Sequence, residues 1–462
     1  MNKPNAFLLL TAALLIAGCG NNAPSNDTTT GGTTGTKTAE TEAKAAPTGE
    51  GAQTGDLEVV AFKGGYDIDF YATAAKEYEK KHNGLKITVK GDPRVWDQLR
   101  PRLVNNDAPG LMFPGWGMDH WALVAEGQLL ALDDALKSKP YQGDGTWGDT
   151  FEPSLLALGQ QDGHQYILPY YFNVMGWWYD PGVFAKNGWT VPRTFDDLLK
   201  LSEQIKAKGI APITYQGKYP YYMIDGMLLP WAFDIGGADA VKAAQNLEPG
   251  AWKSPAFLQA AKMIKQLQDK GFFQKGATAM SHTESQTEFL EGHAAMIPCG
   301  TWLSSEMKKV MPAGAKMEFM LPPSVAGGKG DASNVIIGIE PWMIPSKAKN
   351  PDGAVALFKY MTSLDKAKQF VEEKSTLMAI KGSDAAKLPD ALKTPAKVFK
   401  DSKAVWSVQY RQWYPAFETE MENALTSMLN GEATPEQFCD RVEAAAEKVR
   451  QDTSITKHKV AG

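Results

Sequence analysis

A set of aromatic residues lies within a few positions of Gly or Pro, outside helical or strand spacing, and these residues are candidates for contact with a ligand. Their type suits a sugar, because a pyranose has an apolar face that can lie on an indole and a hydroxyl rim that needs polar partners. If about 50 Å² of that face is covered, each stack contributes on the order of 1 kcal/mol, and each charged hydrogen bond adds roughly 1.5 to 3 kcal/mol. A single loop aromatic more often fills a local core, so only the set as a whole favours binding. The set is Tyr66, Trp116, Trp121, Trp231, Trp302, Trp342 and Trp413.

Motifs for catalysis or cofactor binding are weak in this chain. One G-x-G-x-x-G run occupies residues 143–148, but Lys139-Pro140-Tyr141 precedes it where a dinucleotide-binding loop would follow a strand. No amphipathic helix opens on its last glycine, so the sequence predicts a surface turn. The sequence contains no P-loop, no G-x-S-x-G elbow, no H-E-x-x-H motif and no paired C-x-x-C motif. No cofactor is predicted.

The histidines and the carboxylates point to no reaction of their own. The six histidines are scattered without the spacing of metal ligands, so no metal site is predicted. Only His120, in a loop rich in Gly and Trp, is a candidate for ligand contact. A glycosidase would need two carboxylates that face each other across a cleft. With 53 acidic residues the sequence excludes no such pair and singles none out, so an enzyme stays open as the alternative.

The N-terminus predicts export and a lipid anchor. Lys3 is followed by a short apolar run from residue 7 to 16 and by Ala17-Gly18-Cys19, which resembles a lipobox. The run is about half of the roughly 20 residues that span a bilayer. We therefore expect a signal peptide at 1–18, an acylated Cys19 and a disordered linker that reaches residue 55, since residues 20–55 contain no large apolar side chain.

The rest of the chain is expected to be a monomeric, extracytoplasmic α/β protein. It is too long for one core, so two domains are expected. The net charge of −5, without a basic block, argues against nucleic acid as a partner. With Cys19 acylated, Cys299 and Cys439 remain, and the sequence leaves open whether they form a disulfide or stay as two buried thiols.

Strand patterns alternate with helix patterns along the chain. Residues 57–62, 85–89 and 110–113 read as buried strands, and the helix between the first two strands places apolar residues at i, i+3, i+4 and i+7. A later helix is expected to begin at the N-cap Thr194, with Asp197 three residues on. The alternation favours a sheet with parallel neighbours, flanked by helices.

Several segments, in this order, resemble the extracellular solute-binding proteins of carbohydrate ABC importers, the family that includes the maltose-binding protein. The match covers nearly all of the chain after the linker. One segment departs from the family: residues 338–342 read Gly-Ile-Glu-Pro-Trp where many members have paired glycines. The matching segments are Phe62-Lys63-Gly64-Gly65-Tyr66-Asp67, residues 106–113, residues 127–133, residues 163–180, residues 192–198, Glu291-Gly292-His293-Ala294-Ala295-Met296, Gly300-Thr301-Trp302, residues 342–354 and residues 429–436.

The resemblance implies a two-lobed periplasmic-binding-protein fold of type II, with discontinuous lobes joined by hinge crossings. The N-terminal lobe would hold residues 56–170 and 324–370, and the C-terminal lobe residues 174–321 and 375–455. The crossings would lie near 169–173, 321–324 and 364–375.

By motif position, the resemblance also implies which residues touch the ligand between the lobes. Trp302 and Trp413 would be stacking platforms, Asn173 would lie at the hinge, and the other contacts would be Tyr66, Asp67, Trp116, Asp119, Tyr221, Tyr222, Asp225, Glu340 and Trp342.

The implied function is a substrate-binding lipoprotein that captures a mono- or oligosaccharide by hinge closure and delivers it to the permease subunits of an ABC importer. The alternatives are a secreted glycosidase-like enzyme, or a binding protein for a polyamine or an amino acid.

Overall fold

The computed structural model describes residues 46–51 and 53–460. Cys19, the predicted signal peptide and most of the predicted linker lie outside the described residues. The end of that linker, expected to be disordered, is held by the body: the backbone N–H groups of Thr48 and Gly49 donate to Asp352 Oδ1 at 3.1 and 3.3 Å. In the part of the chain that is described, no helix combines the length and the apolarity that a membrane crossing requires.

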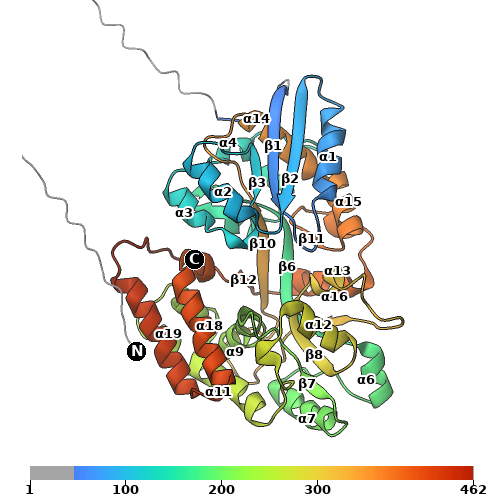
Figure 1. Ribbon diagram of the computed structural model, residues 1–462, viewed down its shortest axis with the longest axis vertical. Coiled ribbons are helices and arrows are strands. Elements are labelled where there is room, and N and C mark those ends of the chain that lie inside the picture. Colours follow the sequence, from blue (N-terminus) through green and yellow to red (C-terminus); the bar gives the residue numbers. More distant parts are fainter. Residues whose placement is uncertain (1–45, 52, 461–462) are drawn as a thin grey trace, which may run out of the picture. The chain divides into compact units, whose positions relative to one another are not determined.

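A parallel three-stranded sheet, in the order β2-β1-β3, carries the first part of the chain (Figure 1). The strands predicted at 57–62, 85–89 and 110–113 are confirmed. Helices α1 and α2 connect the strands, and α14 and α15 return to this sheet from much later in the sequence. The bounds are β1 Gly55–Phe62, β2 Leu85–Asp92, β3 Leu111–Phe113, α1 Asp69–Glu79, α2 Val95–Val104, α3 His120–Ala125, α4 Asp133–Lys137, α14 Pro351–Met361 and α15 Leu364–Lys374.

A larger mixed sheet runs in the order β12-β10-β6-β8-β7, and β9 and β11 also pair with β6. Strand β6 is antiparallel to all four strands that pair with it. The expectation of parallel neighbours holds for β1 with β2 and β3, for β10 with β12 and for β7 with β8, but not for β6. The bounds are β6 Leu168–Tyr179, β7 Ala211–Ile213, β8 Ala294–Gly300, β9 Glu318–Met320, β10 Val335–Trp342, β11 Leu377–Met378 and β12 Val405–Ser407.

Helices cover the larger sheet. Helix α7 begins as predicted, because Thr194 and Asp197 form a capping box, and it buries Leu198, Leu201 and Ile205 at helical spacing. The bounds are α6 Pro181–Asn187, α7 Phe195–Lys206, α8 Tyr221–Met223, α9 Leu229–Gly236, α10 Ala238–Gln245, α11 Pro255–Asp269, α12 His282–Leu290, α13 Leu303–Glu306, α16 Asp390–Asp401, α17 Tyr410–Trp413, α18 Pro415–Leu429 and α19 Pro435–Gln451.

Two clusters of buried side chains form the cores of the described body. The first core lies under α1, α14 and α15 and is rich in aromatic rings. The second core lies among the helices of the larger sheet and extends to α2 and α3. The G-x-G-x-x-G run is a turn, as predicted, and its Trp147 belongs to the first core. Cys299 and Cys439 are both buried free thiols, so they form no disulfide with each other.

The chain passes between the two cores later than expected at two of three crossings. The first crossing lies inside β6, which pairs with β10 up to Val174 and with β8 from Met175. The second crossing is not at 321–324, since Val325 still hydrogen-bonds Asp234 of α9 at 2.9 Å. It lies inside β10, whose start is in the second core and whose end is in the first.

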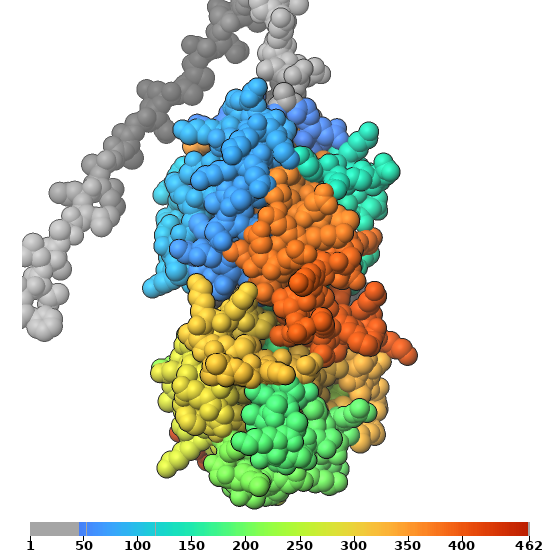
Figure 2. Space-filling view, turned by 90° about the vertical axis from the view of Figure 1, so that its right-hand side faces the viewer, coloured from blue at the N-terminus to red at the C-terminus, as the bar shows by residue number. Residues whose placement is uncertain are grey.

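The third crossing also differs from the expectation of 364–375. Helix α15, which fills most of that range, buries Ala367, Phe370 and Val371 in the first core, and β11 still pairs with the first half of β6. The chain therefore crosses between β11 and α16, a helix that contacts β9. Figure 2 shows the orange segment, which contains α14 to α16, running from the upper half of that face to its middle.

Candidate functional site

One side chain, Asn173, ties four segments together where β6 changes partners. Its Nδ2 donates to Oε1 of Glu340 in β10 at 3.2 Å. Its Oδ1 accepts from the hydroxyl of Tyr66, which follows β1, at 3.4 Å and from Oγ1 of Thr301, which follows β8, at 3.3 Å. The structure thus brings three of the predicted site residues into one hydrogen-bonded network, which we call the crossing network (Tyr66, Asn173, Thr301, Glu340).

Glu340 is the ionisable acid of this network. It lies where the register between β10 and β6 shifts, between Ile339 and Pro341, and a bulge of this kind re-aims side chains. Burial raises the pKa of Glu340 to about 8, and no charged neighbour offsets that rise. At neutral pH this carboxyl is therefore largely protonated, so it can donate as well as accept hydrogen bonds.

Trp302 follows the crossing network directly in sequence and contacts both cores while staying partly exposed. Its ring lies over Gly300, where a Cβ would come within 1.9 Å of a ring carbon. Tyr222 meets Trp302 edge to face at 5.8 Å between ring centroids, and Tyr221 stacks on Tyr222 at 4.3 Å. We call Trp302, Tyr222 and Tyr221 the aromatic row.

A buried ion cluster supports the far end of the aromatic row. The guanidinium of Arg411 lies over the Tyr221 ring at 5.2 Å, donates to both oxygens of Asp225 at 2.9 and 2.8 Å, and donates to Glu418 Oε1 at 2.8 Å. Burial raises the pKa of Glu418, and burial together with the Glu418 charge raises the pKa of Glu422 to about 7. The cluster carries more carboxylates than cations, which suits ligand groups that donate hydrogen bonds.

Trp413, expected to be an open platform, is only 9% exposed. The ring of His458 stacks on it at 5.4 Å with an interplanar angle of 25°. Burial lowers the pKa of His458, and the charges of Asp119, at the N-cap of α3, and of Asp162 offset part of that shift. Next to Asp119, burial lowers the pKa of His120 to about 3, and a hydrogen bond with Gln412 of α17 offsets part of that shift.

Three other expected contacts lie away from these groups or cannot be placed. Trp342 has 0% exposure and lies among Tyr71 and Phe113 at 5.0 and 5.4 Å, so the expectation that it contacts ligand is corrected: this indole belongs to the first core. Asp67 is exposed and accepts from the backbone of Ile68 at 2.7 Å. The side chain of Trp116 lies outside the described part of the chain.

Sequence reasoning missed three residues that complete these groups. Thr301 lies in the matching segment Gly300-Thr301-Trp302 and Arg411 lies two residues before Trp413, but neither was expected to contact ligand. His458 carried no such signal, because a histidine in a polar terminal stretch reads as a surface residue.

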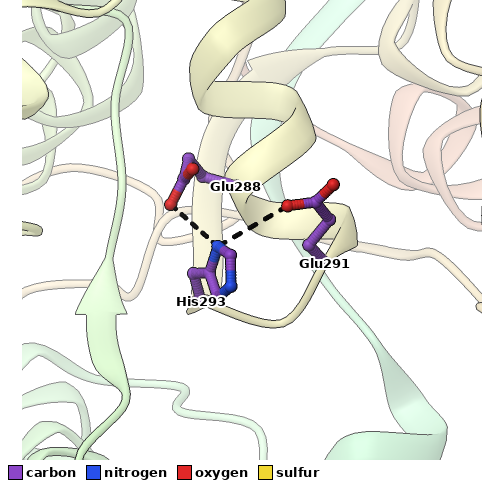
Figure 3. Close-up of side chains that lie close together, drawn as sticks. All are labelled: Glu288, Glu291 and His293. Atoms are coloured by element: carbon purple, nitrogen blue, oxygen red, sulfur yellow. Dashed lines mark hydrogen bonds and ion pairs between the residues drawn. The ribbon is translucent and has the colours of Figure 1, made fainter.

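Figure 3 shows a separate group of possible metal ligands, Glu288, Glu291 and His293, at the turn between α12 and β8. Nδ1 of His293 faces Oε2 of Glu288 at 3.0 Å and Oε2 of Glu291 at 3.7 Å. Glu288 also accepts from Gln274 at 2.5 Å. Hydrogen bonds within this exposed cluster explain its geometry, and we assign no metal to it.

Comparisons with known proteins match this chain to solute-binding and sugar-binding proteins of bacteria. Residues 65–368 match the family model described as bacterial extracellular solute-binding protein. The diacetylchitobiose binding protein NgcE of Streptomyces coelicolor is 27% identical over 416 residues, which cover 88% of this chain and 88% of that protein. The multiple sugar-binding protein of Streptococcus mutans is 26% identical over 265 residues, 56% of this chain and 62% of that protein.

Solved structures share the fold. A chitin oligosaccharide binding protein superposes with a TM-score of 0.70 at 19% identity, over 86% of this chain and 98% of the other. The binding protein RafE in complex with raffinose gives a TM-score of 0.68 at 21% identity, over 86% and 99%. The fold is therefore the two-lobed α/β fold of type II periplasmic binding proteins, as the sequence predicted.

Proposed function

The chain belongs to the bacterial extracellular solute-binding protein family, and on that premise we propose that it captures a mono- or oligosaccharide and delivers it unchanged to the permease subunits of an ABC importer. The family consists of binding proteins, not enzymes, and it works outside the cytoplasm. Anchoring through an acylated Cys19 is part of the proposal and rests on the lipobox-like sequence.

The observation that carries the proposal is the aromatic row beside the crossing network. Trp302 contacts both cores and stays partly exposed, so a flat apolar ligand face can reach it. Burial of about 50 Å² on this indole would contribute on the order of 1 kcal/mol. Tyr66 and Thr301 are buried and donate to Asn173, whereas Glu340 is partly exposed. The Glu340 carboxyl can therefore form a hydrogen bond with the polar rim of a sugar.

Closure around the ligand is the proposed mechanism. Tyr66 follows β1 of the smaller sheet and Thr301 follows β8 of the larger one, and both hydrogen-bond Asn173 on a strand that crosses between the two cores. A ligand that contacts both sides is fully satisfied only when the sides approach each other. The closed form would then be the one that the permease recognises.

The test is a thermal-shift panel of the purified full chain with disaccharides and tetrasaccharides of the chitin, maltose and cellulose series, raffinose, spermidine and glycine. We expect at least one saccharide to raise the melting temperature and to reduce the radius of gyration in X-ray scattering. Product analysis after long incubation should recover that saccharide intact. A shift with spermidine or glycine alone, or cleavage of the sugar, would contradict the proposal.

A further inference from the structure

The last described residues, 452–460, which we call the C-terminal tail, return to the body after α19 ends at Gln451. Two hydrogen bonds from backbone N–H groups hold this tail near His458. The His458 N–H donates to the Tyr414 hydroxyl at 2.8 Å, and the Val460 N–H donates to Oδ1 of Asn246 at 2.8 Å. The position of the His458 ring is therefore set by main-chain contacts, independently of its own chemistry.

The His458 ring covers Trp413 in the way that a sugar ring would. The two rings stack at 5.4 Å with an interplanar angle of 25°, and Trp413, which the second core also contacts, is only 9% exposed. Trp302, in contrast, is partly exposed. Of the two tryptophans that were expected to be platforms, only one is accessible while the tail is in place.

We propose that the C-terminal tail determines the length of saccharide that this protein accepts, because His458 occupies the stacking face of Trp413 and leaves Trp302 as the available platform. This inference rests on the proposed function. A short ligand would bind at the aromatic row without disturbing the tail, whereas a longer one would have to displace His458 before its far sugar could reach Trp413.

The test compares His458→Ala with Lys459→Ala in the full chain, by calorimetric titration with the dimer and the tetramer of whichever saccharide series raises the melting temperature. His458→Ala removes the ring but keeps the backbone bonds to Tyr414, so the tail should stay in place. We expect it to strengthen tetramer binding about twofold to tenfold, the range of one aromatic stack, and to leave dimer binding unchanged. Lys459 is exposed, so its variant should match the wild type with both ligands.

Two further measurements keep the test decisive if His458→Ala proves unstable. A chain that ends at Asp452 should show the same gain for the tetramer. In the wild type, NMR resonances of the His458 ring, shifted by the Trp413 ring current, should stay in place when the dimer binds. Equal gains for dimer and tetramer, no gain for either, or displacement of His458 by the dimer would overturn the inference while leaving the proposed function intact. If no saccharide binds at all, both the inference about saccharide length and the proposed function are contradicted.

Discussion

Trp342 and Trp302 were both expected to contact ligand, and they differ in what surrounds each indole. Trp342 has rings on several sides, including Tyr71, Phe113 and Phe358 within 5.4 Å between centroids. Trp302 lies against Gly300, meets Tyr222 edge to face and stays partly exposed. Both were expected to touch ligand, yet only Trp302 is accessible.

The difference shows that an aromatic residue becomes a platform when one of its faces lacks a protein neighbour. Gly300 leaves room for the Trp302 ring, because a Cβ there would come within 1.9 Å of a ring carbon, and the ring stays partly exposed. In the first core, the neighbours of Trp342 are Tyr71 of α1, Phe113 of β3 and Phe358 of α14. The indole is therefore buried by segments from distant parts of the chain. Replacing Trp342 should therefore lower stability, whereas replacing Trp302 should lower saccharide affinity.

The largest effect is expected for Trp342→Ala, which leaves a cavity among large rings. The free energy of unfolding should fall by about 3 to 5 kcal/mol, measured by urea denaturation. Saccharide affinity of the remaining folded protein should stay unchanged. A variant with normal stability but weakened binding would show that Trp342 is a ligand contact after all, and the contrast between the two indoles would fail.

Arg411→Met tests whether the aromatic row depends on its ion cluster. Asp225 and Glu418 are both buried, and removing their shared cation leaves two uncompensated carboxylates. We expect a loss of about 3 kcal/mol in the free energy of unfolding at neutral pH. The loss should shrink as the pH falls, because burial raises the pKa of Glu418 and protonation of this carboxyl removes one of the unpaired charges.

The matched control for that variant is Arg441→Met. Arg441 pairs with Glu420 at 2.9 Å, and each side chain is 39% exposed. An exposed pair of this kind contributes about 0 to 1 kcal/mol, so the control should be nearly as stable as the wild type. Similar losses in both variants would mean that burial of the cluster is not what makes it important.

Trp302→Ala should weaken saccharide binding and leave stability nearly unchanged, the reverse of what is expected for Trp342→Ala. Saccharide affinity should fall about fivefold, since loss of one stack costs on the order of 1 kcal/mol, while the melting temperature should change little. Gly300→Ala is a companion variant, because its methyl group must displace the Trp302 ring; it too should weaken binding. Unfolding of the Trp302 variant would place this indole in the same class as Trp342.

The smallest effect concerns Glu340, which lies two residues before Trp342 on the same strand. Its pKa rises from an ordinary value of 4.5 to about 8 in the folded protein, so the folded state binds a proton more tightly than the unfolded state. The contribution of Glu340 to stability is therefore fully present below about pH 4.5 and is lost as the pH rises through 8. Between these two pH values, the free energy of unfolding should change less in Glu340→Gln than in the wild type, by about 1 kcal/mol or more. An unchanged pH profile would mean that Glu340 is solvated.

Local signals predicted much of the fold correctly. The three strands of the smaller sheet and the N-cap of α7 were recognised because burial patterns and capping depend on residues within one turn or one strand. The positions of the second and third crossings were wrong, because they depend on which core a segment joins. Residues 325–334 stay with α9 through contacts such as Val325 with Asp234, which are 91 positions apart.

The candidate site was likewise only partly predictable. The family resemblance implied contacts from Tyr66, Asn173, Trp302, Tyr221, Tyr222, Asp225 and Glu340, and in the structure these residues form two groups that Thr301 and Arg411 complete. Residue type did not distinguish Trp302 from Trp342, nor did it connect Trp413 with His458, which lies 45 positions later in the sequence.

By itself, the sequence determined the class of this protein: its α/β order, its family motifs and a supply of aromatic and carboxyl groups suited to a sugar. Only the tertiary structure decided which of those groups are accessible. The physical reason is that accessibility is set by all the segments that surround a side chain, and in this fold those segments come from both sides of the crossings and from the C-terminal tail.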